Sequence, residues 1–363
     1  MFFPNSRCLA CGAALGFDPE RLAMISLEPD GDEGLWREAP SDDAAASDTA
    51  QPALRWRRCV NLESASGCNW LVAEHDAAAD TPPQCRCCRL LRTVPDLSSA
   101  QNTLWFQRVE TARRHLVATL LGLGLPVRSR LSEDTERGLA FDVLLAEPGQ
   151  PAVVTGHADG VITIDLQEAD DAQREQRRTA LGEPYRTLLG HLRHESGHYF
   201  WQRLVRDDAQ RLAEWRECFG DERQDYAQAL QRHYTEGAPA DWSMRFVSAY
   251  ASAHPWEDWA ETWAHYLHMT DTLETAAACG VSIRPRRRDE PALPRVPAAA
   301  GSPEAAFDRL MASWFPLTYV LNNLNRGMGQ PDAYPFVLSP RAVEKLRFVH
   351  QTVAAAAGVG VRA

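Results

Sequence analysis

The most informative stretch of the sequence is Glu183-Pro-Tyr-Arg-Thr-Leu-Leu-Gly-His-Leu-Arg-His-Glu-Ser-Gly-His-Tyr-Phe-Trp201. It contains the pattern H-E-x-x-H at His194, Glu195 and His198. Residues four apart lie on one face of an α-helix, one turn apart, so both imidazoles can reach one zinc ion. Glu195 is placed to take a proton from a zinc-bound water, as a general base does. The stretch therefore predicts a helix that carries a catalytic zinc site.

Two further features support the helix. Pro184 suits its first turn, and apolar residues recur at helical spacing, namely Leu188, Leu189, Leu192, Phe200 and Leu204. Gly190 and Gly197 each cost about 1 kcal/mol of helix stability relative to alanine. Gly197 lies inside the motif, which indicates that another backbone or a substrate approaches closely there.

A catalytic zinc needs a third protein ligand and one open position. The ligand is expected in the stretch His254-Pro-Trp-Glu-Asp-Trp-Ala-Glu-Thr-Trp-Ala-His-Tyr-Leu-His268. On a helical wheel its apolar residues form one stripe, made of Trp256, Trp259, Ala260, Trp263 and Leu267. Glu257 and Glu261 stack on a separate stripe, which is unfavourable unless a cation lies opposite.

Either glutamate could be the third ligand. We favour Glu257 as the ligand and Glu261, one turn along, as the acceptor of a hydrogen bond from a ligand histidine. His191, His265 and His268 are more typical of packing histidines, and we leave them out of the ligand set. Tyr250 precedes the second helix and is a candidate donor to a developing oxyanion. Its alternative role is packing against the neighbouring tryptophans.

Nine cysteines form the other distinctive pattern, and seven of them precede residue 89. An odd number bunched at one end is more typical of metal ligation than of disulfides. Four lie close enough in sequence to close one tetrahedral structural zinc site, namely Cys59, Cys68, Cys85 and Cys88. Cys8 and Cys11 form a further C-x-x-C without partners. The alternative is a core of unliganded thiols. We interpret Cys218 and Cys279 as core residues of helices.

The remaining sequence suggests two parts. Residues 1–97 hold the cysteines and an acidic loop at about 29–52. Residues 98–363 begin with a helix over about 101–123, capped by Ser98 or Ser99, and continue with short strands at 139–145, 152–155 and 161–165. From residue 168 the pattern is nearly all helical, interrupted by a proline-rich loop at about 284–303.

Composition narrows the classes of function. The 363 residues carry a net charge of −11, which argues against a nucleic-acid-binding protein because such proteins present a basic surface. Only Arg55, Arg57 and Arg58 favour that class. No apolar run is long enough for a membrane span, and the first residues lack a signal-peptide pattern. We expect a cytoplasmic protein.

At three places the chain resembles a bacterial family of zinc-binding metallopeptidases with an N-terminal zinc-ribbon. The blocks are Thr155–Asp165, Glu183–Trp201 and Phe246–His268, and the likeness extends to about residue 283. The arrangement is also similar to glutamate-zincins such as the catalytic domain of anthrax lethal factor. The resemblance implies an α+β fold, in which a small zinc-ribbon domain precedes a mostly helical, zincin-like domain with a short sheet.

The resemblance also bears on single residues. In glutamate-zincins the third ligand opens a segment like Glu257–Glu261, and an oxyanion-stabilising tyrosine lies seven residues before it, which matches Tyr250. Family members begin with an additional C-x-x-C upstream of a segment like Phe3-Pro4-Asn5. This chain starts at that segment, which casts doubt on Cys8 and Cys11 as ligands.

Two hypotheses from different classes follow. The first is a zinc-dependent peptidase that acts on peptides or proteins, with one catalytic and one structural zinc, and with the strand 161–165 pairing with an extended substrate. The second is an adaptor whose zinc-ribbon binds a protein partner and whose helical zinc is structural.

Overall fold

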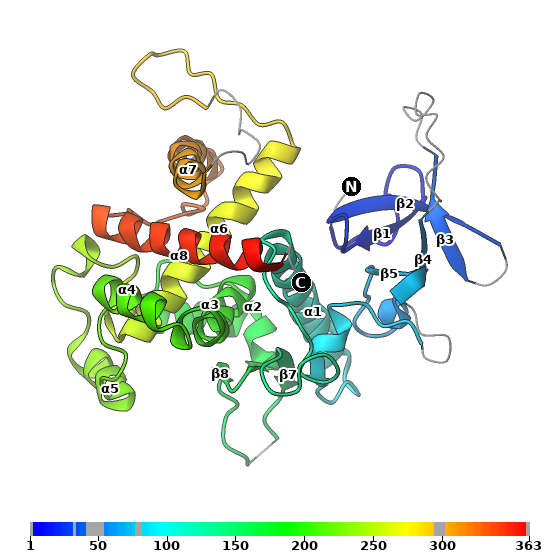
Figure 1. The fold of residues 1–363 in the computed structure, drawn as a ribbon, viewed down its shortest axis with the longest axis horizontal. Helices are drawn as coiled ribbons and strands as arrows, with labels where there is room; N and C mark the ends of the chain where they lie inside the picture. The colour runs from blue at the N-terminus through cyan, green and yellow to red at the C-terminus, as the bar shows by residue number, and fades with distance from the viewer. Residues whose placement is uncertain are drawn as a thin grey trace. The chain divides into compact units, whose positions relative to one another are not determined.

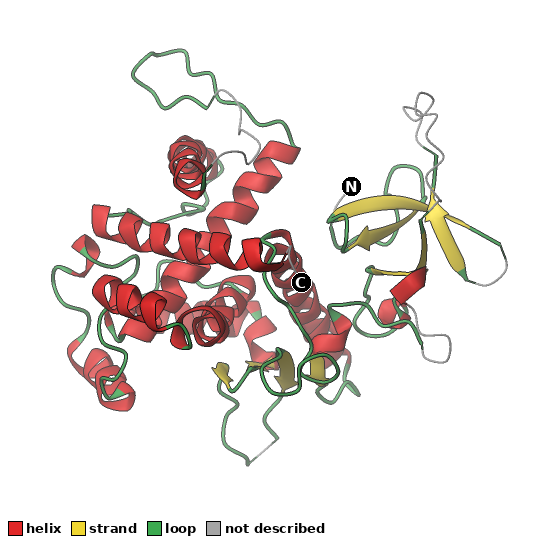
Figure 2. Ribbon diagram, viewed as in Figure 1, coloured by secondary structure: helices red, strands yellow, loops and turns green. Residues whose placement is uncertain are grey.

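The computed structural model describes residues 3–31, 34–40, 54–76, 82–147, 149–293 and 302–360. The chain divides into two compact units. The first comprises Met1–Gly122 and Val127–Gln173, and the second Leu123–Pro126 and Arg174–Ala363. The strands belong to the first unit and most helices to the second (Figure 2), which confirms a mixed, mostly helical α+β chain. The domain boundary that we predict after residue 97 falls inside the first unit.

The cysteine-rich region is built around a five-stranded antiparallel sheet in sequential order. Its strands are β1 (Ala14–Asp18), β2 (Ala23–Pro29), β3 (Leu35–Glu38), β4 (Arg55–Arg58) and β5 (Leu71–Ala73). Alternate residues bury one face of the sheet, with Ile25, Leu27 and Trp56 in its core. The described residues of this region also form short 3₁₀ helices at Val60–Leu62, Glu74–Asp76 and Cys88–Leu90.

Strand β3 corrects the predicted acidic loop at 29–52. Trp36 lies opposite Trp56 of β4, and the guanidinium of Arg58 stacks over the Trp36 ring at 4.2 Å. These contacts stabilise the segment as a strand, although its acidic composition predicted a loop. Residues 41–52 of the predicted loop lie outside the described residues.

A second sheet in the same unit has the order β6-β7-β9-β8. Helix α1 (Ala100–Gly122) belongs to the same unit and confirms the predicted helix. Ser99 caps this helix, because its hydroxyl accepts a hydrogen bond from the Asn102 amide at 3.0 Å. The strands are β6 (Leu91–Thr93), β7 (Ala140–Leu144), β8 (Gly156–Ala158) and β9 (Val161–Asp165). The strands predicted at 139–145 and 161–165 are therefore present.

The prediction of a strand at 152–155 is wrong. Those residues are irregular, Val154 is exposed, and the Thr155 hydroxyl accepts a hydrogen bond from the Asp165 amide. The strand forms at β8 instead. The predicted substrate pairing of residues 161–165 is also wrong, because β9 lies between β7 and β8 and pairs with both.

The second unit is helical. Its elements are α3 (Leu188–Trp201), α4 (Ala209–Phe219), α5 (Tyr226–Glu236), α6 (Pro255–Ala278), α7 (Pro303–Gly327) and α8 (Pro340–Gly360). Helix α2 (Asp171–Leu181) spans the division between the units. The core of the second unit is rich in fully buried aromatic side chains, including Trp215, Trp259 and Trp263. Helix α6 lies among α3, α7 and α8 (Figure 1).

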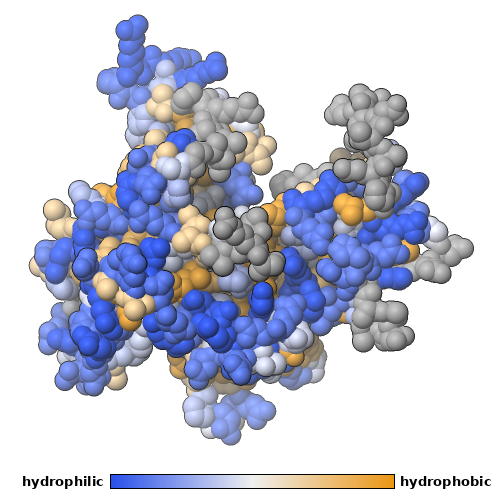
Figure 3. Space-filling model, viewed as in Figure 1, coloured by the Kyte–Doolittle hydropathy of each residue, from blue (hydrophilic) through white to orange (hydrophobic). Residues whose placement is uncertain are grey.

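Cys218 is half-buried in α4, whereas Cys279 is exposed. The prediction that Cys279 is a core residue is wrong, because it lies at the C-terminal cap of α6 and not within a buried turn. Among the described residues, no helix is long and apolar enough to cross a bilayer. The face of the molecule drawn in Figure 3 is mainly hydrophilic, with apolar residues in small patches.

Candidate metal centre

Helix α3 begins at Leu188, four residues later than Pro184 suggested. The Thr187 hydroxyl caps it by accepting a hydrogen bond from the Gly190 amide at 3.0 Å. The local signal for the start is therefore the threonine cap and not the proline. The stretch before it is a loop in which Arg186 pairs with Glu183.

Helices α3 and α6 meet at Gly197. A Cβ atom there would lie 2.9 Å from the Ala260 Cα atom of α6. The Trp259 indole N–H donates to the Gly197 carbonyl at 2.8 Å, and the Trp263 indole donates to the Ser196 hydroxyl at 3.0 Å. This confirms the predicted close approach of another backbone at Gly197, and it brings the two motif helices into contact.

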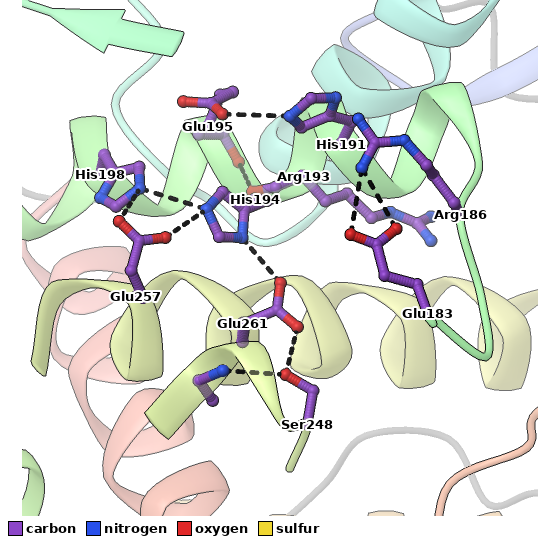
Figure 4. A network of polar contacts seen from close by, with 12 residues as sticks. Glu183, Arg186, His191, Arg193, His194, Glu195, His198, Ser248, Glu257 and Glu261 are labelled. Carbon is purple, nitrogen blue, oxygen red and sulfur yellow. Dashed lines mark hydrogen bonds and ion pairs between the residues drawn. The ribbon is translucent and has the colours of Figure 1, made fainter. Parts of the chain in front are cut away.

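The contact between the helices brings three side chains together (Figure 4). The Nε2 atoms of His194 and His198 lie 3.2 Å apart. The Glu257 Oε2 atom is 3.0 Å from the His194 Nε2, and its Oε1 is 3.6 Å from the His198 Nε2. These three residues form a group of possible metal ligands whose ligand atoms all lie within 4.8 Å of one another.

Glu261 contacts the other side of the same histidine. Its Oε1 atom is 2.8 Å from the His194 Nδ1, and its Oε2 accepts a hydrogen bond from the Ser248 hydroxyl at 2.6 Å. Ser248 in turn accepts from the Ala251 amide at 3.1 Å. No local sequence signal marks Ser248, because its contact joins residues 13 positions apart and depends on the turn before α6.

The arrangement fits a zinc ion. On a tetrahedral zinc with Zn–N and Zn–O distances of about 2.0–2.2 Å, neighbouring ligand atoms lie about 3.3–3.6 Å apart. The two histidine Nε2 atoms lie 3.2 Å apart and the Glu257 Oε2 lies 3.0 Å from the His194 Nε2, both slightly below this range, while the 3.6 Å distance from the His198 Nε2 is to the other Glu257 oxygen. The Glu257 Oε2 atom is buried and accepts no hydrogen bond from the described residues. A buried carboxylate oxygen that lies 3.0 Å from an imidazole nitrogen and accepts no hydrogen bond fits a site for a cation.

The charges agree with a cation at this site. Burial would lower the pKa of His194, but Glu257 and Glu261 outweigh it and raise this pKa well above its ordinary value. Burial would raise the pKa of Glu257, and the two histidines lower it instead. The buried carboxylates therefore favour positive charge at His194, whereas burial keeps the pKa of His198 below its ordinary value. A divalent cation would supply positive charge beside both neutral imidazoles.

Glu195 directly follows His194 in the sequence, and its side chain is buried. Burial would raise its pKa, but the hydrogen bond with His191 and the nearby histidines lower it to about 2, so this carboxylate is ionised. The His191 Nε2 atom is 3.4 Å from the Glu195 Oε1. His191 thus contacts the candidate base, a role that the sequence interpretation missed, although the i,i+4 spacing was visible.

Two tyrosines lie beside the centre. The Tyr250 ring centroid is 6.0 Å from that of His194. Tyr226, the first residue of α5, donates its hydroxyl to the Glu257 Oε1 at 2.7 Å. No local sequence signal marked Tyr226. His265 and His268 have other partners, the Tyr334 hydroxyl and Arg193, and lie outside the ligand group.

The first unit holds a separate cluster of cysteines. Cys59, Cys68, Cys85 and Cys88 are all buried, with their sulfur atoms within 4.8 Å of one another. The Cys68 and Cys85 sulfur atoms lie 3.6 Å apart, close to the spacing of about 3.8 Å expected on a tetrahedral zinc with Zn–S distances of about 2.3 Å. The cluster therefore fits a structural zinc.

Three other cysteines of this region stand apart from the cluster. Cys8 is half-buried and Cys11 is exposed, in the turn before β1. Cys87 is fully buried, and burial raises the pKa of its thiol to about 12. None of the three belongs to the group of ligands found among the described residues.

Comparison with known proteins places this architecture in context. A family model described as "Putative zinc-binding metallo-peptidase" matches residues 102–352, and a zinc-ribbon domain model matches residues 1–99. Three similar proteins are Uncharacterized protein Mb2598c of Mycobacterium bovis and Uncharacterized proteins MT2644 and Rv2568c of Mycobacterium tuberculosis. Each is 42% identical over 351 residues, covering 97% of this chain and 91% of the relative. No solved structure matches the chain.

Proposed function

The chain belongs to this zinc-binding metallopeptidase family, and from that membership we propose that it is a peptidase of the glutamate-zincin type that hydrolyses peptide bonds. His194, His198 and Glu257 would hold the catalytic zinc, and Glu261 would orient His194. Two observations carry the proposal: His194, His198 and Glu257 each offer one ligand atom, all within 4.8 Å of one another, and the buried Glu257 Oε2 accepts no hydrogen bond from the described residues.

The residues of the chain would divide the reaction between them. Glu195, ionised and held by His191, would take a proton from the attacking water and later give one to the leaving amine. Tyr250, which lies beside His194, would donate a hydrogen bond to the developing oxyanion. When bound, zinc supplies Lewis acidity that lowers the pKa of water and polarises the scissile carbonyl.

We assign the four buried cysteines to one structural zinc and propose peptides or proteins as substrates. We also propose a cytoplasmic location. The buried cysteines without disulfides support it, because a reducing compartment keeps thiols free to bind metal. The adaptor hypothesis requires instead that the helical zinc be structural and that the chain hydrolyse nothing.

The variant Glu195→Gln tests the proposal. It removes the base and leaves the three proposed ligands, so it should retain the wild-type zinc content and lose hydrolysis by about 10²–10⁴-fold. Hydrolysis is measured on a mixed peptide library by mass spectrometry, with zinc-loaded wild type beside it. Full activity in Glu195→Gln contradicts the mechanism, and an inactive wild type that holds zinc at His194 favours the adaptor.

A further inference from the structure

Tyr226 links α5 to the candidate metal ligand on α6. Its hydroxyl donates to the Glu257 Oε1 atom at 2.7 Å. Glu257 is 1% exposed, whereas Tyr226 is 37% exposed. An accessible tyrosine therefore provides a hydrogen bond to a carboxylate that solvent hardly reaches.

The two oxygens of Glu257 have different surroundings. Oε1 accepts the Tyr226 hydroxyl, and it lies farther from a histidine nitrogen, at 3.6 Å from His198. Oε2 lies 3.0 Å from the His194 Nε2 and accepts no hydrogen bond from the described residues. With a metal on its Nε2, His194 would be neutral and would donate its Nδ1 proton to Glu261, so its Nε2 would have no proton for that oxygen. Oε2 is thus the oxygen left for a cation.

From this asymmetry we infer that Tyr226 is a positioning residue that restricts Glu257 to binding the metal through Oε2 alone. A carboxylate that binds through both oxygens takes two coordination positions, whereas one that binds through a single oxygen leaves a position for water and substrate. The inference rests on the proposed function, because it assumes that Glu257 is a ligand.

The packing around Tyr226 suits this role. Its ring centroid lies 5.2 Å from that of His254 and 5.9 Å from that of Trp256, at the start of α6. These contacts orient the ring without the hydroxyl. A tyrosine hydroxyl with an ordinary pKa of about 10 is protonated at neutral pH, so it can donate this hydrogen bond. Tyr226→Phe therefore removes the hydrogen bond and keeps the packing.

The test measures metal binding and not hydrolysis. The chain is first loaded with one zinc at the cysteine cluster and then titrated with Co²⁺, whose visible spectrum reports the coordination number. Binding at His194, His198 and Glu257 gives no sulfur-to-cobalt absorption, which distinguishes it from the cysteine cluster. Tyr234→Phe is the matched control, since Tyr234 lies on the same helix and is 62% exposed.

We expect Tyr226→Phe to weaken Co²⁺ binding by about 10–100-fold, the range for loss of a hydrogen bond to a metal ligand. Its visible bands should also weaken as the coordination number rises, and Tyr234→Phe should match wild type. Wild-type affinity and spectrum in Tyr226→Phe overturn the inference and leave the proposed function standing. A wild-type chain that binds no Co²⁺ beyond the cysteine cluster overturns both.

A crystal structure of the zinc-loaded wild-type chain provides a second measurement that needs no variant. The inference requires Oε2 alone within about 2.2 Å of the metal, with Oε1 still hydrogen-bonded to Tyr226. Both Glu257 oxygens on the metal, with the Tyr226 hydroxyl turned away, contradict it.

Discussion

The Nδ1 atom of His194 lies 2.8 Å from the Oε1 of Glu261, while the Nε2 of the same ring faces Glu257 at 3.0 Å. Glu257 thus lies on the Nε2 side of the ring, where the proposed metal would bind, and Glu261 lies on the Nδ1 side. The position relative to the His194 ring therefore distinguishes Glu257 from Glu261, although the sequence places both glutamates on the same helix stripe, one turn apart.

The two glutamates should therefore differ in their effect on zinc affinity. Glu257→Gln replaces a charged ligand and should abolish stoichiometric zinc at the helical site, whereas Glu261→Gln should weaken zinc binding by about 10–100-fold. Competition with a chromophoric chelator measures both, with the exposed Glu274→Gln on the same helix as control. The reverse order, with the larger loss in Glu261→Gln, would make Glu261 the ligand.

Gly197 should be intolerant of a side chain because of the backbone opposite it. A Cβ atom at this position would lie 2.9 Å from the Ala260 Cα, so Gly197→Ala should destabilise the chain by about 1–3 kcal/mol despite its better helix propensity. Gly327→Ala, at a helical position with nothing within 4 Å, is the control and should be neutral or slightly stabilising. Chemical unfolding followed by circular dichroism compares them, and equal stabilities contradict the close approach.

The cysteine cluster predicts a contrast between neighbours. Cys88→Ser removes one of the four proposed ligands and should release the proposed structural zinc and unfold the ribbon, because metal binding supplies much of the folding free energy of such sites. Cys87→Ser, fully buried but outside the cluster, should keep the zinc. Zinc per chain is measured by elemental analysis. Loss of zinc in both variants, or in neither, excludes the proposed ligand set.

Asp142 on β7 predicts a pH dependence of stability in the first unit. It accepts hydrogen bonds from the Arg92 Nε at 2.8 Å and the Thr93 hydroxyl at 2.7 Å. Arg92 chiefly, with Thr93, lowers the pKa of Asp142 against burial. A carboxyl whose pKa is lower in the folded state contributes stability above its unfolded pKa and loses it as the pH falls through the folded value.

Asp142→Asn should therefore cost about 1 kcal/mol at pH 7, a small value because the Arg92 side chain is 45% exposed, and this cost should disappear as the pH falls through the folded pKa of Asp142. Unfolding in urea across this range measures the difference. Asp241→Asn, in an exposed pair with Arg245, is the control. A cost that persists unchanged at the lowest pH would mean that ionisation of Asp142 contributes nothing.

Much of the site was predictable because its signals are local. The spacing of His194 and His198, the apolar stripe of α6 and the bare backbone of Gly197 each follow from helical geometry. The contacts of Ser248 and Tyr226 were not predictable, since they join residues 13 and 31 positions apart and depend on the path of the chain between helices. Strand β3 was not predictable either, because its pairing with β4 stabilises it as a strand although the neighbouring sequence is acidic.

The most direct test of the central claim is anomalous diffraction at the zinc absorption edge from crystals of the zinc-loaded chain. We predict two peaks. One should lie among the four buried cysteines and the other within about 2.0–2.2 Å of the His194 and His198 Nε2 atoms and of Glu257, with a position left for water. A peak at the cysteine cluster alone, or a helical zinc closed by a fourth protein ligand, would contradict the proposal of a catalytic metal centre.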